Sequence, residues 1–347
     1  MMKALVTGGA GFIGSHIVRM LLNENYEVRV LHLPQEKLTN LEGLDVELIA
    51  GDITDSIKMD EAVEGCDLVF HTAAIYALWL PKPELMRKVN VEGTRIVLNA
   101  AKKAGIKRVV YTSTGACFAG QAKGIQATEQ SPFALGATGD AYVLTKFEAH
   151  QIALQFAAGG LDVVIVCPTG PIGPQDIAPT PTGKLLLTIA QMPALAVPAA
   201  INNMIDVRDV AKGHVLAAEK GITGETYILG NRDLDGVSMA KTVHHLLGIW
   251  RPVITIPNLI EGVSSQLAGH AALWVTQHIT HKAPLVTPSA AKIGQLGTSF
   301  NCAKAVQQLG LPQTPVEIAI RDSLLWFAAN GYIQSRSLIK KIEAISI

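Results

Sequence analysis

The sequence is poor in charge and in long apolar runs. Only 17% of its 347 residues are charged, and 29 basic residues balance 29 acidic ones. Proteins that bind nucleic acid or anionic membranes usually carry a basic patch, so we expect neither partner. The longest apolar runs, 185–190 and 194–201, fall well short of the roughly 20 residues that a membrane span needs. We therefore expect no membrane span.

Cysteine is also scarce, and its spacing indicates neither disulfides nor a metal site. The cysteines form no CxxC pair, and no histidine lies near one at metal-ligand spacing. We interpret them as reduced, mostly buried thiols. No signal peptide is expected, because an apolar strand already begins at residue 3. The cysteines are Cys66, Cys117, Cys167 and Cys302. Together these absences favour a cytoplasmic protein without a bound metal.

A glycine-rich turn stands between the first strand pattern and the first helix pattern. It follows the apolar, β-branched residues 3–7 and leads into the helical pattern of 15–22. Gly8 permits a tight turn, Gly11 lets the backbone approach a pyrophosphate, and Gly14 lets the helix pack on the strand. An ordinary turn is the alternative, since glycines mark turns as well. With strand and helix on either side, the pattern favours a dinucleotide site with contacts from Gly8, Gly11, Phe12 and Ile13.

Strand and helix patterns continue to alternate through the first half of the chain. This alternation predicts an α/β fold, a Rossmann-type doubly wound parallel sheet with helices on both faces. The alternation weakens from about residue 171, where proline becomes more frequent. We therefore predict a dinucleotide-binding domain over 1–170 and a smaller substrate-binding part over 171–347. Late Rossmann elements would interleave at about 204–230, and an apolar helix is expected near 257–279.

The second strand ends at His32-Leu33, where this fold meets the adenosine ribose. An acidic residue there would bind the hydroxyl of NAD, and an arginine would accommodate the 2′-phosphate of NADP. The sequence offers neither, so His32 and Lys37 favour NADP(H) only slightly over NAD(H). After the third strand, Asp52 is expected to accept from the adenine amino group, with Ile53 beside it. Asp55 is expected to cap the following helix.

Small and hydroxyl-bearing residues follow the fourth, fifth and sixth strands. Ligands of open α/β sheets bind outside the carboxyl ends of the strands, so these residues should meet the cofactor. The loop 76–83 is apolar but carries two prolines, which predicts a lid over an apolar substrate or a segment packed on the surface. The expected cofactor contacts are Thr72, Ala73, Ala74, Thr112, Pro168 and Gly170. The expected substrate contacts are Tyr76, Trp79, Ser113, Gly115 and Phe118.

A tyrosine and a lysine lie one helical turn apart, at Tyr142 and Lys146. An ammonium beside a tyrosine stabilises the phenolate and lowers the pKa of the phenol toward working pH. Of the six tyrosines, only Tyr142 has lysine at the fourth position after it. Alone this pair would be an ordinary feature of a helix surface. Its position after a glycine turn and a hydroxyl-rich strand end favours proton transfer.

In this order the motifs resemble those of the extended short-chain dehydrogenase/reductases, over essentially the whole chain. Three further segments look like the dihydroflavonol-4-reductase-like branch, which includes bacterial proteins labelled hopanoid-associated sugar epimerases. Those segments are 76–79, 179–183 and 326–332. The family motifs are Thr7 to Gly14, Gly51 to Asp55, His71 to Ala74, Asn90 to Thr94, and Tyr142 with Lys146.

The resemblance implies roles for the central residues. Tyr142 would protonate the carbonyl oxygen, and Lys146 would lower its pKa and bind the nicotinamide ribose. Thr114 would hydrogen-bond the substrate oxygen, with Ser113 as the fallback if the strand register slips by one. The nicotinamide would supply the hydride. Family members often dimerise through the helices near 93–103 and 142–156, so a homodimer is possible.

The family divides between simple carbonyl chemistry and sugar-nucleotide chemistry. Its sugar-nucleotide enzymes hold a diphosphate with an asparagine, at a position that is Gly170 here, and with arginine. The sequence has no arginine between residues 109 and 207, and only Lys184 offers a cation early in the second part. We therefore predict an NAD(P)-dependent oxidoreductase for a hydrophobic ketone, aldehyde or secondary alcohol. The alternatives are a nucleotide-sugar epimerase or dehydratase, and a non-catalytic dinucleotide-binding sensor.

Overall fold

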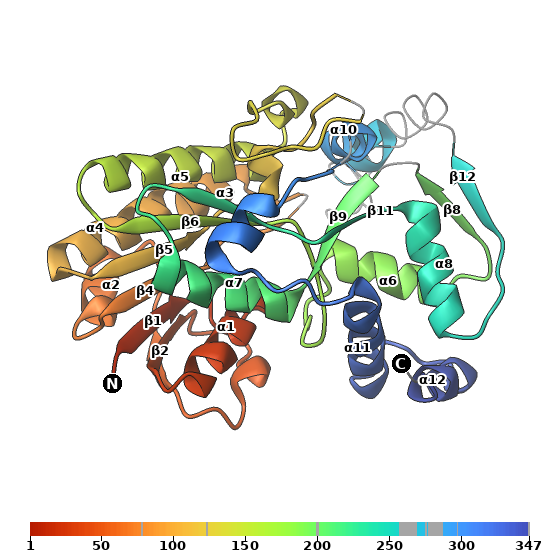
Figure 1. Cartoon of the computed structure of the whole chain (residues 1–347), viewed down its shortest axis with the longest axis horizontal. Coiled ribbons are helices and arrows are strands. Elements are labelled where there is room, and N and C mark those ends of the chain that lie inside the picture. The colour runs from red at the N-terminus through yellow and green to blue at the C-terminus, as the bar shows by residue number, and fades with distance from the viewer. Residues whose placement is uncertain are drawn as a thin grey trace.

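Seven parallel strands form the central sheet, in the order β10-β6-β5-β4-β1-β2-β3 (Figure 1). The computed structural model describes residues 1–77, 79–122, 124–198, 201–256, 269–274, 276, 287–296 and 298–345. The sheet confirms the predicted α/β fold. Its strands are β1 (Lys3–Thr7), β2 (Glu27–His32), β3 (Glu47–Ala50), β4 (Leu68–His71), β5 (Arg108–Thr112), β6 (Val163–Pro168) and β10 (Thr226–Leu229).

Helices cover both faces of this sheet because successive strand residues point to opposite sides. Leu5 and Val109 belong to one buried cluster, whereas their neighbours Val6 and Val110 belong to another. The first cluster lies beneath α2 (Ser56–Val63), α4 (Thr94–Ala104) and α5 (Ala141–Ala158). The second lies beneath α1 (Phe12–Asn23) and α7 (Val207–Lys220), which pack against each other.

A smaller part with its own apolar core occupies the right side of Figure 1. Its helices are α6 (Pro181–Gln191), α8 (Gly236–Leu246), α11 (Val316–Ala329) and α12 (Arg336–Glu343). Helix α10 (Pro288–Leu296) instead packs on the larger part, where Ser289 donates to Asp140 at the start of α5. The strands of the smaller part are β7 (Gly170–Ile172), β9 (Ile201–Asp206) and β11 (Arg232–Asp235) in one sheet, and β8 (Leu195–Pro198) with β12 (Val253–Ile256) in another. Between these elements the chain returns to the large sheet as α7 and β10. The boundary near residue 170 stays a prediction.

One helix begins earlier than the sequence predicts. The helix expected to begin at Asn90 begins seven residues earlier, as α3 (Pro83–Arg87) followed by a π-helical turn, η2 (Lys88–Gly93), and α4. Proline suits the first turn of a helix because its missing N–H has no partner there. Most of the apolar helix expected near 257–279 lies outside the described residues.

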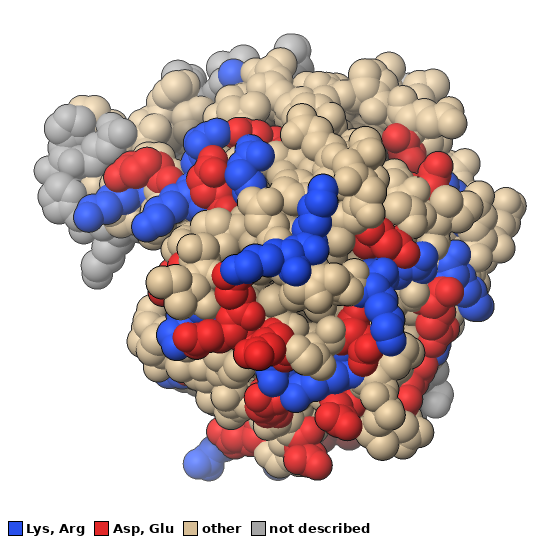
Figure 2. Space-filling view, turned by 90° about the vertical axis from the view of Figure 1, so that its left-hand side faces the viewer, with Lys and Arg blue, Asp and Glu red and all other residues tan. Residues whose placement is uncertain are grey.

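Charges of both signs are interspersed over the end of the molecule that Figure 2 shows. Ion pairs of the described residues include those of Lys3 and Arg29 with Glu47. Among the described residues, no helix is both long and apolar enough to cross a membrane. The cytoplasmic location and the homodimer stay predictions.

Candidate active site

The glycine turn after β1 is built so that side chains would not fit. Gly8 has a positive φ of 70°, and a Cβ there would lie 2.9 Å from the Ala73 backbone at the end of β4. A Cβ on Gly14 would collide with the Gly8 carbonyl oxygen. Helix α1 begins after Gly11, and no side chain caps its first N–H groups. This bare helix start fits the diphosphate of a dinucleotide, which gains stabilisation from the N–H groups and the helix dipole.

The end of β2, where the sequence predicts the adenosine ribose, carries a carboxylate. The His32 imidazole Nδ1 lies 2.9 Å from the Leu33 carbonyl oxygen, and the Leu33 N–H donates to Glu36 Oε2 at 3.2 Å. Lys37 is exposed beside them. Glu36 was missed in the sequence because it lies four residues beyond the strand end, where no fixed spacing identifies it.

The two aspartates after β3 play different parts. Asp55 accepts hydrogen bonds from the N–H groups of Ile57 and Lys58, which confirms it as the cap of α2. Asp52 accepts from the Thr54 N–H at 2.8 Å. Ile53 is buried in the core, so any contact between its side chain and the adenine is limited.

The ends of β4 and β6 bring backbone close to the glycine turn and to β9. The Thr72 hydroxyl donates to the Thr7 carbonyl oxygen at 2.6 Å, and Ala74 beyond it is exposed. Pro168 ends β6. At Gly170 a Cβ would lie 2.7 Å from the Asn203 carbonyl oxygen, so this position cannot hold a side chain without movement of the backbone.

Two of the three consecutive hydroxyls after β5 are occupied within the core. The Thr112 hydroxyl lies 2.8 Å from His214 Nε2 on α7, beneath one face of the sheet. The Ser113 hydroxyl is buried and lies 2.9 Å from His150 Nδ1 on α5, beneath the other face. Neither hydroxyl faces the strand edge, in contrast to the expectation for both.

The third hydroxyl meets the tyrosine of α5. Thr114 accepts from the Ala116 N–H at 3.3 Å, and its side chain lies beside that of Tyr142. The ring of Tyr142 packs on that of Tyr76, with centroids 4.6 Å apart. Asp140 caps α5 through the Val143 N–H and so sets where the helix begins.

The expected lowering of the Tyr142 pKa is not found. Burial raises its pKa above the ordinary value, the neighbouring Tyr76 raises it further, and the hydrogen bond from Thr114 opposes them. The Lys146 ammonium instead donates to the Thr112 carbonyl oxygen at 2.7 Å and to the Tyr111 hydroxyl at 3.1 Å. Lys146 is itself buried, which lowers its pKa to about 8.

Of the other predicted substrate contacts, two lie in the core and two lie on the loop after β4. Phe118 is buried with its ring 5.6 Å from that of His150, and Gly115 is buried against Phe300. Both therefore belong to the core, which differs from the prediction. Trp79 is half-buried and Tyr76 is 53% exposed, so both stay on the accessible loop.

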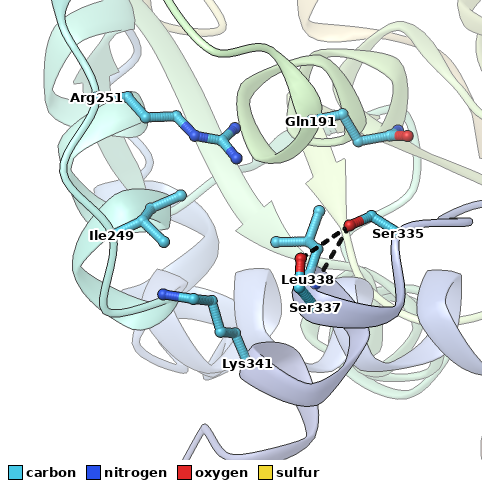
Figure 3. Close-up of a pocket in the computed structure, with 7 residues that line it drawn as sticks. All are labelled: Gln191, Ile249, Arg251, Ser335, Ser337, Leu338 and Lys341. Carbon is cyan, nitrogen blue, oxygen red and sulfur yellow. Dashed lines mark hydrogen bonds between the residues drawn. The ribbon is translucent and has the colours of Figure 1, made fainter.

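A cavity of about 190 Å³ lies elsewhere, in the smaller part (Figure 3). The Arg251 guanidinium donates to the carbonyl oxygens of Ala190 and Met192 at the end of α6. Lys341 donates to the Gly248 carbonyl oxygen. These contacts cap helix ends, and none of the lining residues belongs to the site described above. They are Gln191, Ile249, Arg251, Ser335, Ser337, Leu338 and Lys341.

The glycine turn, the strand edge and the Tyr142–Lys146 helix lie within one matched region. Residues 4–230 match the model of a family described as the NAD dependent epimerase/dehydratase family. The chain belongs to this family. The predicted resemblance is thereby confirmed, and the protein is a member of an enzyme family of NAD(P)-dependent oxidoreductases, epimerases and dehydratases.

Relatives within the family cover nearly the whole chain. A Synechocystis protein described as a "Putative dihydroflavonol 4-reductase" is 36% identical over 341 residues, covering 95% of this chain and 96% of its own. Sterol demethylase protein B of Methylococcus capsulatus is 29% identical, covering 96% and 100%. A 4-hydroxy-2-methyl-3-oxo-4-farnesyl-3,4-dihydroquinoline-1-oxide ketoreductase of Stigmatella aurantiaca is 31% identical, covering 89% and 91%. The crystal structure of gox2253 superposes with a TM-score of 0.84 at 33% identity, covering 96% and 100%.

Proposed function

We propose that this family member is a carbonyl reductase or alcohol dehydrogenase that uses NAD(P)(H) and acts on a hydrophobic ketone, aldehyde or secondary alcohol. One observation carries the proposal. The phenol of Tyr142 lies beside Thr114 at the carboxyl edge of the sheet, on the helix that also carries Lys146. The exposed ring of Tyr76 lies directly against it.

The side chains divide the chemistry between them. The nicotinamide supplies or accepts the hydride when it is bound. The turn with Gly8 and Gly11 would hold the diphosphate. Thr114 orients the carbonyl oxygen, and Tyr142 donates a proton to that oxygen. Because burial raises its pKa, Tyr142 holds its proton at neutral pH, as a general acid in carbonyl reduction must.

Four of the five arginines of the second part are held by other groups, which supports an apolar substrate. A buried diphosphate would need a free guanidinium. Arg208 is held between Asp206 and Asp322, and Arg232 is paired with Glu317. Arg251 and Arg321 are likewise bonded, to carbonyl oxygens of α6 and to Asp322 respectively.

Two further observations support a hydrophobic substrate. Gly170 has no room for the asparagine that the family's sugar-nucleotide enzymes use at this position. The names of two relatives refer to a sterol and to a farnesylated 3-oxo-quinoline, both large and apolar. For the cofactor, we propose a slight preference for NADP(H) through His32 and Lys37, which the Glu36 carboxylate opposes.

A spectrophotometric screen tests this function. Wild-type protein is mixed with NADPH or NADH and with aromatic and polycyclic ketones, and loss of the reduced cofactor is followed. Tyr142→Phe should lower kcat by about 100-fold or more, because the general acid is lost. Tyr26→Phe, which alters a tyrosine at the turn before β2, is the matched control and should keep wild-type activity.

The other outcomes identify the competing functions. Unchanged turnover in Tyr142→Phe would contradict the proposed proton donor. Conversion of UDP- or dTDP-sugars without ketone reduction would assign the protein to the sugar-nucleotide enzymes. Tight binding of the dinucleotide with no turnover of either substrate class would indicate a sensor.

A further inference from the structure

Tyr111 on β5 lies beneath the Lys146 ammonium. Its side chain is fully buried, Lys146 Nζ lies 4.8 Å above the ring centroid, and the same nitrogen donates to the hydroxyl at 3.1 Å. Nothing in the sequence distinguishes Tyr111 from the other apolar residues of its strand. The contact appears only because α5 packs across the end of β5.

A chain of buried hydrogen bonds fixes which way the Tyr111 hydroxyl points. The Thr94 hydroxyl donates to the Asn90 carbonyl oxygen at 2.7 Å, so toward its other neighbours it can only accept. One of those neighbours is His71 Nε2, at 3.0 Å, and the Tyr111 hydroxyl lies beside Thr94 as well. An ammonium can only donate, so the Tyr111 oxygen accepts from Lys146, and its own proton can point to Thr94.

The hydrogen bonds at His71, at the far end of this network, agree with Thr94 acting as an acceptor. His71 is buried and its pKa is lowered to about 3 by burial, so the ring is neutral. With its Nε2 donating to Thr94, its Nδ1 must accept, and the Thr7 hydroxyl lies 2.8 Å from it. Each hydroxyl and ring nitrogen from Thr7 to Thr94 thus has a donor or acceptor role that fits its neighbours.

We propose that Tyr111 is a positioning residue that keeps Lys146 charged and fixed on the Thr112 carbonyl oxygen, ready for the reaction proposed above. The importance of this for catalysis rests on that proposed function, whereas the effect on Lys146 itself does not. A buried ammonium is costly unless dipoles replace its water shell, and the hydroxyl and the carbonyl oxygen supply those dipoles.

The titratable groups that surround Lys146 are all neutral near pH 7. Burial raises the pKa of Tyr111 and of the Cys117 and Cys167 thiols. It lowers the pKa of the two histidines, to about 3 for His71 and about 4 for His150. Because no carboxylate is among them, Lys146 depends on neutral dipoles to keep its charge. These groups are His71 on β4, Tyr111 on β5, Cys117 after β5, His150 on α5 and Cys167 on β6.

The direct test measures the ionisation of Lys146 without any cofactor. The full chain is labelled with ¹³C at lysine Cε, and NMR follows the side-chain signals against pH, with Lys146→Met identifying the relevant signal. In wild type we expect titration near pH 8. Tyr111→Phe keeps the ring and removes only the hydroxyl, and it should lower this midpoint by about one pH unit, because one charge-assisted hydrogen bond is lost.

Tyr227→Phe is the matched control. Tyr227 is also fully buried in the same sheet, with Lys304 Nζ 4.7 Å above its ring and its hydroxyl accepting from the Ile222 N–H. Its replacement should leave the Lys146 titration unchanged. Thr94→Val, a second variant, removes the group that accepts the Tyr111 proton and should also lower the midpoint.

The pH dependence of turnover gives a second readout. In Tyr111→Phe the pH at which the rate of ketone reduction falls off on the alkaline side should be lower by the same amount. The rate at pH 6 should stay near that of wild type. An unchanged Lys146 titration in both Tyr111→Phe and Thr94→Val would overturn the proposal. If the protein reduces no ketone, the proposed function fails, but the titration still decides the role of Tyr111.

Discussion

The rings of Tyr76 and Tyr142 pack at a tilt of 45°, with centroids 4.6 Å apart. Tyr76 comes from the loop after β4 and Tyr142 from the first turn of α5. A carbonyl bound at the phenol of Tyr142 would therefore lie near the ring of Tyr76. This contact makes the loop after β4 one wall of the proposed substrate site.

Replacing Tyr76 should change substrate affinity rather than chemistry. Tyr76→Ala should raise KM for a polycyclic ketone about three- to tenfold, because an aromatic contact of about 1 kcal/mol is lost. Tyr76→Phe keeps the ring and should stay near wild type. Steady-state kinetics with a polycyclic and a small aliphatic ketone check this. An equal rise of KM for both ketones would mean that the ring does not contact the larger one.

Two substitutions in the glycine turn should affect cofactor binding and folding separately. Gly11 has an ordinary φ of −74°, and a Cβ there would lie 3.2 Å from its nearest neighbour, the Gly8 carbonyl oxygen. Gly11→Ala should thus fold with only a small loss of stability but bind the dinucleotide about tenfold or more weakly, since the added methyl group would hinder the approach of the diphosphate. Gly14→Ala should instead lower Tm, because its methyl group collides with backbone. Thermal melts and fluorescence titrations distinguish the two, and unaltered binding in Gly11→Ala would contradict the assignment of the turn.

The carboxylate of Glu36 should weaken binding of a 2′-phosphate. Glu36→Gln should shift the ratio of NADPH to NADH affinity about fivefold toward NADPH, since one partly exposed charge contributes about 1 kcal/mol or less. Glu42→Gln, an exposed position farther along the same segment, is the control. Titrations of cofactor fluorescence at low and high salt measure the effect. A ratio that is the same in both variants would place the ribose away from Glu36.

Buried neutral histidines should make the fold sensitive to mild acid. Among the described residues, burial lowers the pKa of five histidines from 6.5. The pKa falls to about 3 for His71 and to about 4 for His16, His150 and His214, and it is lowered for His244 as well. The unfolded chain binds protons below pH 6.5 while the folded chain does not, so stability is full above that pH and falls as pH drops toward 4. Each such histidine contributes a slope of about 1.4 kcal/mol per pH unit.

Urea unfolding between pH 7 and pH 5 measures this slope. His214→Gln should remove the share of one histidine, whereas His245→Gln, at an exposed position, should leave the slope unchanged. A slope of the same size in His214→Gln would show that His214 does not stay neutral in the folded protein.

Much of the fold could be predicted from local patterns. The strand, glycine turn and helix at the start of the chain are contiguous, so their spacing alone indicated them. Asp55 was identified as a cap because capping depends on residues two and three positions away. The helix at Pro83 was missed because its first turns carry no clear apolar period.

The hydroxyls after β5 show what local patterns cannot decide. Thr112, Ser113 and Thr114 are alike in sequence, yet their partners are His214, His150 and Tyr142. Those partners come from α7 and α5, the first of them 102 residues away. Which hydroxyl faces the site thus depends on how two helices pack on opposite faces of the sheet.

The sequence by itself determined the order of elements, the family and the presence of a tyrosine and a lysine on one helix face. The tertiary structure decided the electrostatics of that pair. Burial raises the pKa of Tyr142, and Lys146 binds Tyr111 and the Thr112 carbonyl oxygen. The physical reason is that the pKa of a group depends on its water exposure and its neighbours in space, which a linear motif does not contain.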